Sequence, residues 1–165
     1  MGVMNGEHCY FFALEVAPLK IGYAYKTLPL HCTLLHRFFS RLPPSDIDAK
    51  VRWLFAQTKP LLLTPEERIA FGPNRVLVAR LRLSPALQAI HLKLYGQLNE
   101  LGVRYSETDW VGPGYKPHVT DQAGTSLALD ETRLSRTVYL VEVEHPLKGP
   151  RKFIKTKFEL TAKTK

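Results

Sequence analysis

The pattern of apolar and polar residues along this chain predicts more β-strands than helices. Residues 9–17 are aromatic and branched and stop before Pro18, which is typical of a buried strand. Residues 76–83 place Arg80 and Arg82 between apolar positions, the pattern of a half-exposed strand. Residues 18–29 have no clear period and predict a loop or a short irregular strand. Further strands are expected over residues 30–39, 61–64, 68–71, 115–122, 137–144 and 152–160, the last two as a C-terminal hairpin.

Two helices interrupt these strands. The first is predicted to start with Ser45 as N-cap and Asp48 in the capping-box position, and to stop by Lys59 because Pro60 follows. The second has Ser84 as N-cap, Pro85 in its first turn and Gly102 just past its end. Apolar residues recur at helical spacing in both: Ile47, Val51, Leu54 and Phe55 in the first, and Leu87, Ile90, Leu94, Leu98 and Leu101 in the second.

The order of these elements predicts an α+β fold. Strand groups with helices inserted between them favour two antiparallel sheets with the helices packed outside. At 165 residues the chain is long enough for one domain with a substantial core. We therefore expect a single bilobal domain over residues 1–165, with two pseudo-symmetric lobes and a groove between them.

Composition and charge narrow the choice of partner. A content of 45% hydrophobic and 23% charged residues is typical of a soluble globular protein. Lys and Arg exceed Asp and Glu by 23 − 15 = 8, which favours an anionic ligand, with nucleotide or RNA first. Cys9 and Cys32 have no CxxC spacing and are expected to be buried reduced thiols. The sequence has no apolar run of membrane length, no signal-peptide core and no myristoylation signal. We therefore expect a cytoplasmic protein without a membrane partner, and we expect it to be a monomer.

The candidate chemistry lies in two similar elements that are 118 − 31 = 87 residues apart. Each is a histidine followed two places later by a threonine: His31 with Thr33, and His118 with Thr120. Residues i and i+2 of a strand share one face, so each pair can present imidazole and hydroxyl together. Two imidazoles across a groove can act as general base and general acid on a phosphate, and the hydroxyls can donate to its non-bridging oxygens. This scheme requires no metal or other cofactor, and the sequence has no cluster with metal-ligand spacing.

The segments 30–34 (LHCTL) and 116–120 (KPHVT) resemble the paired H-x-[ST] motifs of the two-histidine (2H) phosphoesterase superfamily, which includes 2′-5′ RNA ligase-like proteins and cyclic phosphodiesterases. The resemblance implies a bilobal fold with both motifs on central strands beside a cationic groove. It implies hydrolysis of a 2′,3′-cyclic phosphate on a nucleotide or RNA end, usually to a 2′-phosphate, or cleavage and joining of 2′-5′ linkages. It makes His31 and His118 the acid and base, and Thr33 and Thr120 the phosphate ligands.

The sequence departs from the family pattern in two places. Asp121 and Gln122 follow Thr120 where an apolar residue is usual, so the strand is expected to end early or the groove to be more polar there. Residues 18–29 are too short for the long helix of many relatives, which predicts a more open cleft.

Several other residues have a structural and a functional interpretation. His36 alternates with Leu34 and Phe38 and is expected to lie on the buried face. Arg37 is either a rim charge or a phosphate contact, and Tyr115 and Lys116 are candidates to border the groove and bind substrate. His8, His91, His145 and the strand aromatics are expected to be structural.

Two alternatives to catalysis stay open. The first is a nucleotide- or RNA-binding module on the same fold, with little or no catalysis. The second is a protein that binds RNA through its basic surface alone.

The two motifs are nearly symmetric, so the sequence does not distinguish which histidine is the general base and which is the general acid.

Overall fold

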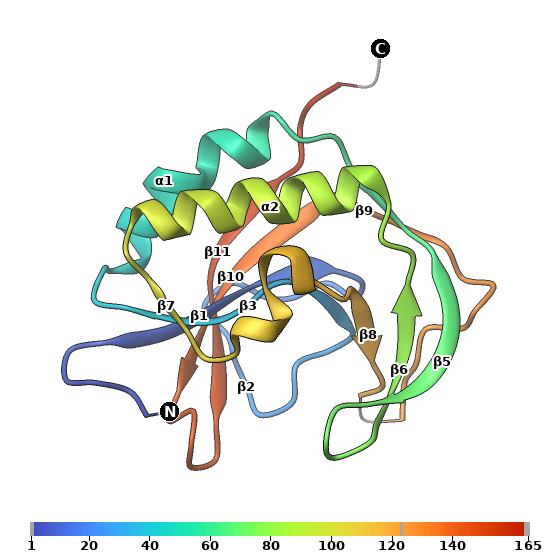
Figure 1. Ribbon diagram of the computed structural model, residues 1–165, viewed down its shortest axis with the longest axis horizontal. Helices are drawn as coiled ribbons and strands as arrows, with labels where there is room; N and C mark the ends of the chain where they lie inside the picture. Colours follow the sequence, from blue (N-terminus) through green and yellow to red (C-terminus); the bar gives the residue numbers. More distant parts are fainter. Residues whose placement is uncertain (1, 123, 164–165) are drawn as a thin grey trace.

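The computed structural model describes residues 2–122 and 124–163, and it shows an α+β fold dominated by one antiparallel sheet (Figure 1). The sheet has nine strands in the order β2-β11-β10-β1-β3-β8-β6-β5, with β7 paired to β3, and a separate sheet contains β4 and β9. The strands are β1 (His8–Glu15), β2 (Ala24–Tyr25), β3 (His31–Ser40), β4 (Leu61–Leu63), β5 (Pro65–Phe71), β6 (Val76–Leu81), β7 (Arg104–Tyr105), β8 (His118–Thr120), β9 (Arg133–Ser135), β10 (Thr137–Glu144) and β11 (Arg151–Glu159). The helices are α1 (Pro44–Ala56) and α2 (Pro85–Glu100), with two short 3₁₀ turns, η1 (Thr108–Trp110) and η2 (Gly112–Gly114).

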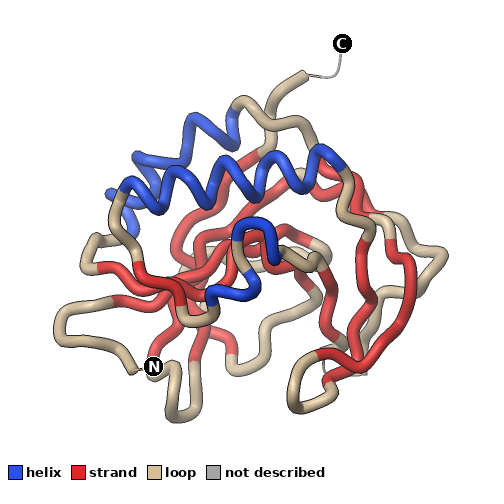
Figure 2. Tube along the Cα trace, in the orientation of Figure 1, coloured by secondary structure: helices blue, strands red, loops and turns tan. Residues whose placement is uncertain are grey.

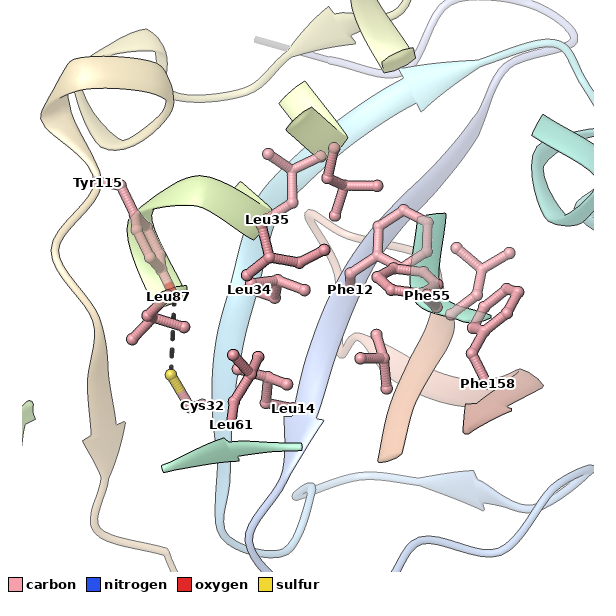
Figure 3. Close-up of a cluster of buried hydrophobic side chains, with 14 of the residues drawn as sticks. Phe12, Leu14, Cys32, Leu34, Leu35, Phe55, Leu61, Leu87, Tyr115 and Phe158 are labelled. Carbon is pink, nitrogen blue, oxygen red and sulfur yellow. Dashed lines mark hydrogen bonds between the residues drawn. The ribbon is translucent and has the colours of Figure 1, made fainter. Parts of the chain in front are cut away.

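The helices cover one face of the sheet. In Figures 1 and 2, α1 and α2 lie along the same side, and β5 and β6 curve away at the other end. The main core lies between the helices and the sheet and includes Tyr10 of β1. In Figure 3, Phe12 and Leu14 of β1 lie in this core together with Phe55 of α1. A second, smaller core on the opposite face contains Cys9, Phe11 and Ala13 with residues of β10 and β11. Because both faces of β1 are covered, its sequence is a nearly continuous apolar run.

Both predicted helices are present, and one of the two predicted N-caps is wrong. The Ser84 side chain accepts a hydrogen bond from the Leu87 amide, as expected for α2. The first helix begins two residues earlier than predicted, with Pro43 as N-cap and no side-chain cap. Pro44 occupies the first turn, where its missing N–H costs no hydrogen bond, so Ser45 lies inside the helix.

The remaining expectations mostly hold. The C-terminal hairpin forms as β10 and β11, and residues 18–29 contain only the short strand β2. The second histidine strand, predicted over residues 115–122, is shorter: β8 ends at Thr120. Asp121 instead donates its backbone N–H to Leu77 and forms an ion pair with Arg68. Neither helix of the described ranges is long and apolar enough to cross a bilayer.

Candidate active site

The two histidine motifs lie on adjacent strands. β3 and β8 pair antiparallel through Cys32 and Val119, which are both fully buried on the helix side. Side chains alternate along a strand, so the residues flanking this pair point to the opposite face. The antiparallel register puts His31 opposite Thr120 and Thr33 opposite His118, and all four are half-buried. Each imidazole therefore neighbours the other motif's hydroxyl, and the two histidines are diagonal across the pair.

The backbone orients both rings in the same way. Nδ1 of His31 lies 2.9 Å from the Pro29 carbonyl oxygen, and Nδ1 of His118 lies 2.8 Å from the Lys116 carbonyl oxygen. A carbonyl oxygen only accepts, so Nδ1 carries the proton and donates it in each case. The neutral ring then has its lone pair on Nε2. Within residues 2–122 and 124–163, no group hydrogen-bonds to Nε2 of either ring.

The two histidines differ in electrostatic surroundings. Burial lowers the pKa of His31 to about 4, and the positive charges of Lys152 and His118 add to that effect. Burial also lowers the pKa of His118, where no neighbouring cation contributes. In both rings the hydrogen bond to the backbone carbonyl opposes the shift. His118 therefore retains a proton more readily than His31.

Within the described residues, two cavities border the motifs. The larger of the two, with a volume of about 480 Å³, lies beside His118 and has aromatic walls. Phe71 at the end of β5 is 4.7 Å from the His118 ring, centroid to centroid, and Trp110 meets Phe71 edge-on at 4.7 Å. Val76, Val78 and Pro73 complete an apolar side. Nζ of Lys116 lies 5.8 Å from the Trp110 ring centroid and borders this cavity, as its position in the sequence suggested. Planar aromatic walls of this kind suit a nucleobase.

A smaller cavity of about 210 Å³ lies beside His31 and is lined by cationic and polar groups. Arg37, Gln122 and Lys152 border it, together with the apolar side chains of Phe11 and Leu28. Both cavities are lined by Thr33, Thr120 and His36. The two threonines therefore lie where the cavities meet. The site is therefore asymmetric, although its two motifs are nearly identical in sequence.

The prediction that His36 faces the buried side is wrong. Phe12 pairs with Leu35 while Ala13 pairs with Thr33, which leaves Leu34 as an extra residue, and Leu34 and Leu35 are both directed into the core (Figure 3). This β-bulge reverses the alternation for the residues that follow. A second irregularity sets His36 and Arg37 together against a single residue of β1, and both end up half-buried on the cavity side. Burial and the adjacent Arg37 charge lower the pKa of His36 to about 4.

Tyr115 lines the cavity beside His118, as expected, and its side chain also holds β3 in place. Its side chain is buried, and its hydroxyl donates to the Thr33 carbonyl oxygen at 2.9 Å. Its ring stacks on His91 with centroids 3.9 Å apart. His91 is a core residue, as expected: Nδ1 donates to the Leu34 carbonyl oxygen at 2.7 Å, and Nε2 accepts from the Gly112 amide at 2.8 Å. Tyr115 and His91 thus connect α2, the η2 turn and β3 at the first motif.

Sequence reasoning missed several cavity residues, among them Phe71 and Lys152. Phe71 ends β5 and Lys152 lies on β11, at distant places in the sheet. No local pattern in the sequence relates either of them to the histidine motifs. In the described part of the chain, no group of three or more His, Cys, Asp or Glu side chains is placed to hold a metal ion. Cys9 and Cys32 are buried free thiols, as predicted.

Comparison with known proteins identifies the family. The model of the 2′-5′ RNA ligase superfamily matches residues 12–143, well over half of the chain. Similar solved structures include a phosphoesterase (TM-score 0.61, 16% identity, covering 93% of this chain and 99% of that one). They also include Escherichia coli LigT with 3′-AMP (TM-score 0.56, 17% identity, 94% and 99%) and TT0787 of Thermus thermophilus (TM-score 0.54, 22% identity, 94% and 100%). The search of curated proteins gave no match.

The solved structures are too distant in sequence to show more than the shared fold, which agrees with the observed α+β architecture. The family model covers both histidine motifs and the elements between them. The chain therefore belongs to the 2′-5′ RNA ligase superfamily of two-histidine phosphoesterases.

Proposed function

We propose that this protein hydrolyses a 2′,3′-cyclic phosphate on a nucleotide or an RNA end, or cleaves and joins 2′-5′ phosphodiester linkages, by acid-base catalysis with His31 and His118. The observation that carries the proposal is the pair of imidazoles on one face of β3 and β8, each with Nδ1 held by a backbone carbonyl and Nε2 free. This arrangement supplies two proton-transfer groups beside two hydroxyl donors.

This geometry supports the following hydrolytic reaction. One neutral Nε2 removes a proton from water as the water oxygen attacks phosphorus. The bond from phosphorus to the ribose 3′-oxygen breaks on the opposite side, and the other imidazole, protonated at Nε2, gives its proton to that oxygen. The product is a 2′-phosphate, and the two histidines have exchanged protonation states, which solvent restores. Each transfer group typically contributes about 10²- to 10⁴-fold.

Thr33 and Thr120 bind the phosphate itself. Their hydroxyls lie between the two histidines, where the cavities meet, and can donate to non-bridging oxygens as negative charge increases there. The nearby cations Arg37, Lys116 and Lys152 favour an anionic ligand in this region.

Two further observations favour a nucleotide. The cavity beside His118 has the aromatic walls of Phe71 and Trp110, on which a base can stack. Structures of the E. coli LigT relative have been solved with 3′-AMP, ATP and NADP⁺.

The test is turnover of 2′,3′-cyclic nucleotides and short 2′-5′ oligonucleotides in the presence of EDTA. We expect activity in the wild type and a loss of at least about 100-fold in His31→Ala and in His118→Ala. His145→Asn is the matched control, because this exposed histidine in the β10–β11 turn lies outside both cavities. Loss of turnover in EDTA, or full activity of both alanine variants, would show the mechanism to be wrong. Tight nucleotide binding without turnover would favour the binding-module alternative.

A further inference from the structure

The half-buried basic side chains fall into two groups. Lys50, Arg80 and Arg104 each form an ion pair with a glutamate. Arg37 and Lys152 are equally half-buried, but neither forms an ion pair with any acidic side chain of residues 2–122 and 124–163. Lys152 donates only to the Lys26 carbonyl oxygen, at 3.3 Å. Desolvated cations are usually paired, so these two are exceptional in this molecule.

Both cations line the smaller cavity beside His31. They come from β3 and β11, which are separated in the sheet by β1 and β10. The two side chains are close enough for the positive charge of Arg37 to add to burial in lowering the pKa of Lys152. Two like charges gathered in one cavity without a carboxylate repel each other until an anion binds between them.

The size and the charge of this cavity suit a phosphate group. Its volume of about 210 Å³ lies below the range of about 300–1,000 Å³ that is usual for sites of drug-sized ligands. It shares Thr33 and Thr120 with the larger, aromatic cavity. A group bound there would therefore be a close neighbour of the phosphate held by the threonines.

We propose that Arg37 and Lys152 form a subsite for a second phosphate of the substrate, so that the protein prefers nucleotides with a phosphate at the 5′ position over nucleosides that carry only the cyclic phosphate. This inference rests on the proposed function. The second phosphate is either a terminal 5′-monophosphate or the diester that joins the last nucleotide of an RNA to the one before it.

The experiment compares kcat/KM for three substrates: a nucleoside 2′,3′-cyclic phosphate, the same nucleoside with an added 5′-phosphate, and a dinucleotide that ends in the cyclic phosphate. We expect a gain of roughly 10- to 100-fold from the second phosphate, the range of one or two charge-assisted hydrogen bonds. A gain with the 5′-monophosphate alone assigns the subsite to a terminal phosphate, and a gain with the dinucleotide assigns it to RNA. Equal kcat/KM for all three substrates would overturn the inference.

Variants locate the effect. In Arg37→Met and Lys152→Met the ratio of kcat/KM between phosphorylated and unphosphorylated substrates should fall toward one. Lys157→Met is the control, because Lys157 lies on β11, as Lys152 does, but is exposed and forms an ion pair with Glu159. In this variant the ratio should stay at the wild-type value. If Arg37→Met and Lys152→Met both keep the wild-type ratio, the preference for a second phosphate does not depend on these side chains, and the inference is overturned. Arg37→Lys keeps the positive charge on β3 and should therefore retain part of the preference that Arg37→Met loses.

A binding measurement separates this inference from the proposed function. If no cyclic phosphate is turned over by the wild type, the proposed function fails, and calorimetry with a nucleoside 2′,5′-bisphosphate and the matching 2′-monophosphate tests the subsite alone. Binding of the bisphosphate that is at least 10-fold tighter, with the difference lost in Lys152→Met, supports the subsite. Equal affinities exclude it.

Discussion

The difference between the two histidines predicts which is the base. With a pKa of about 4, His31 of the free protein is protonated in only about one molecule in 1,000 at pH 7. It is therefore almost fully available as a base and about 10³-fold limited as an acid. Burial lowers the pKa of His118 without a neighbouring cation, so His118 is the member of the pair that more often carries the proton. We expect His31 to activate water and His118 to protonate the leaving oxygen.

A sulfur leaving group tests this assignment. The test substrate is a cyclic phosphorothiolate in which sulfur replaces the 3′-oxygen. When the bond from phosphorus to sulfur breaks, the sulfur leaves as a thiolate, which needs no protonation. In His118→Ala this substrate should recover most of the roughly 10²- to 10⁴-fold loss seen with the oxygen substrate, while His31→Ala should stay equally impaired with both. Rescue of His31→Ala and not of His118→Ala would reverse the roles. Rescue of neither would refute the assignment of a general acid to this pair.

The pH dependence provides a second measurement of the same assignment. The base must be neutral, so kcat/KM should fall as pH decreases through about 4. The acid must be protonated, so kcat/KM should also fall as pH rises through the pKa of His118, which lies below its usual value. The bound phosphate anion favours the protonated imidazole, so the alkaline limb of kcat should lie at higher pH than that of kcat/KM. A flat alkaline limb with the oxygen substrate would contradict the role of His118.

Three further predictions concern the surroundings of the histidines. Thr33→Val and Thr120→Val should each reduce kcat by about 10²- to 10³-fold in the turnover assay with little change in Tm, because each removes one donor to the phosphate; unchanged kcat would exclude that role. Phe71→Ala should raise KM for nucleotides by roughly 5- to 150-fold, because a nucleobase in that cavity loses its stacking partner. An equal rise in KM for an activated phosphodiester that has no nucleobase would argue against a nucleobase in that cavity. Tyr115→Phe should lower the free energy of unfolding in urea by about 1 kcal/mol, because the Thr33 carbonyl loses a buried donor; an unchanged midpoint would show that this hydrogen bond contributes nothing to stability.

The fold class and the shared face of each histidine and its threonine could be predicted because both depend on local patterns. The stripe of α2 and its Ser84 cap follow from helical spacing and from one hydroxyl that satisfies a free amide. The alternation around Cys32 and Val119 predicted that each motif presents its histidine and threonine on one face. The double leucine of β3 was the one local hint of a bulge, and simple alternation across it placed His36 on the wrong side.

The sequence alone determined that the chain carries two equivalent imidazole-hydroxyl elements on strands of an α+β domain, because period and motif are properties of neighbouring residues. Only the tertiary structure decided how these elements differ. The order of strands brings Phe71 from β5 to His118 and Lys152 from β11 to His31, so one half of the site is aromatic and the other cationic. Burial and charge act through space rather than along the chain, and for that reason two nearly identical motifs acquire different pKa values.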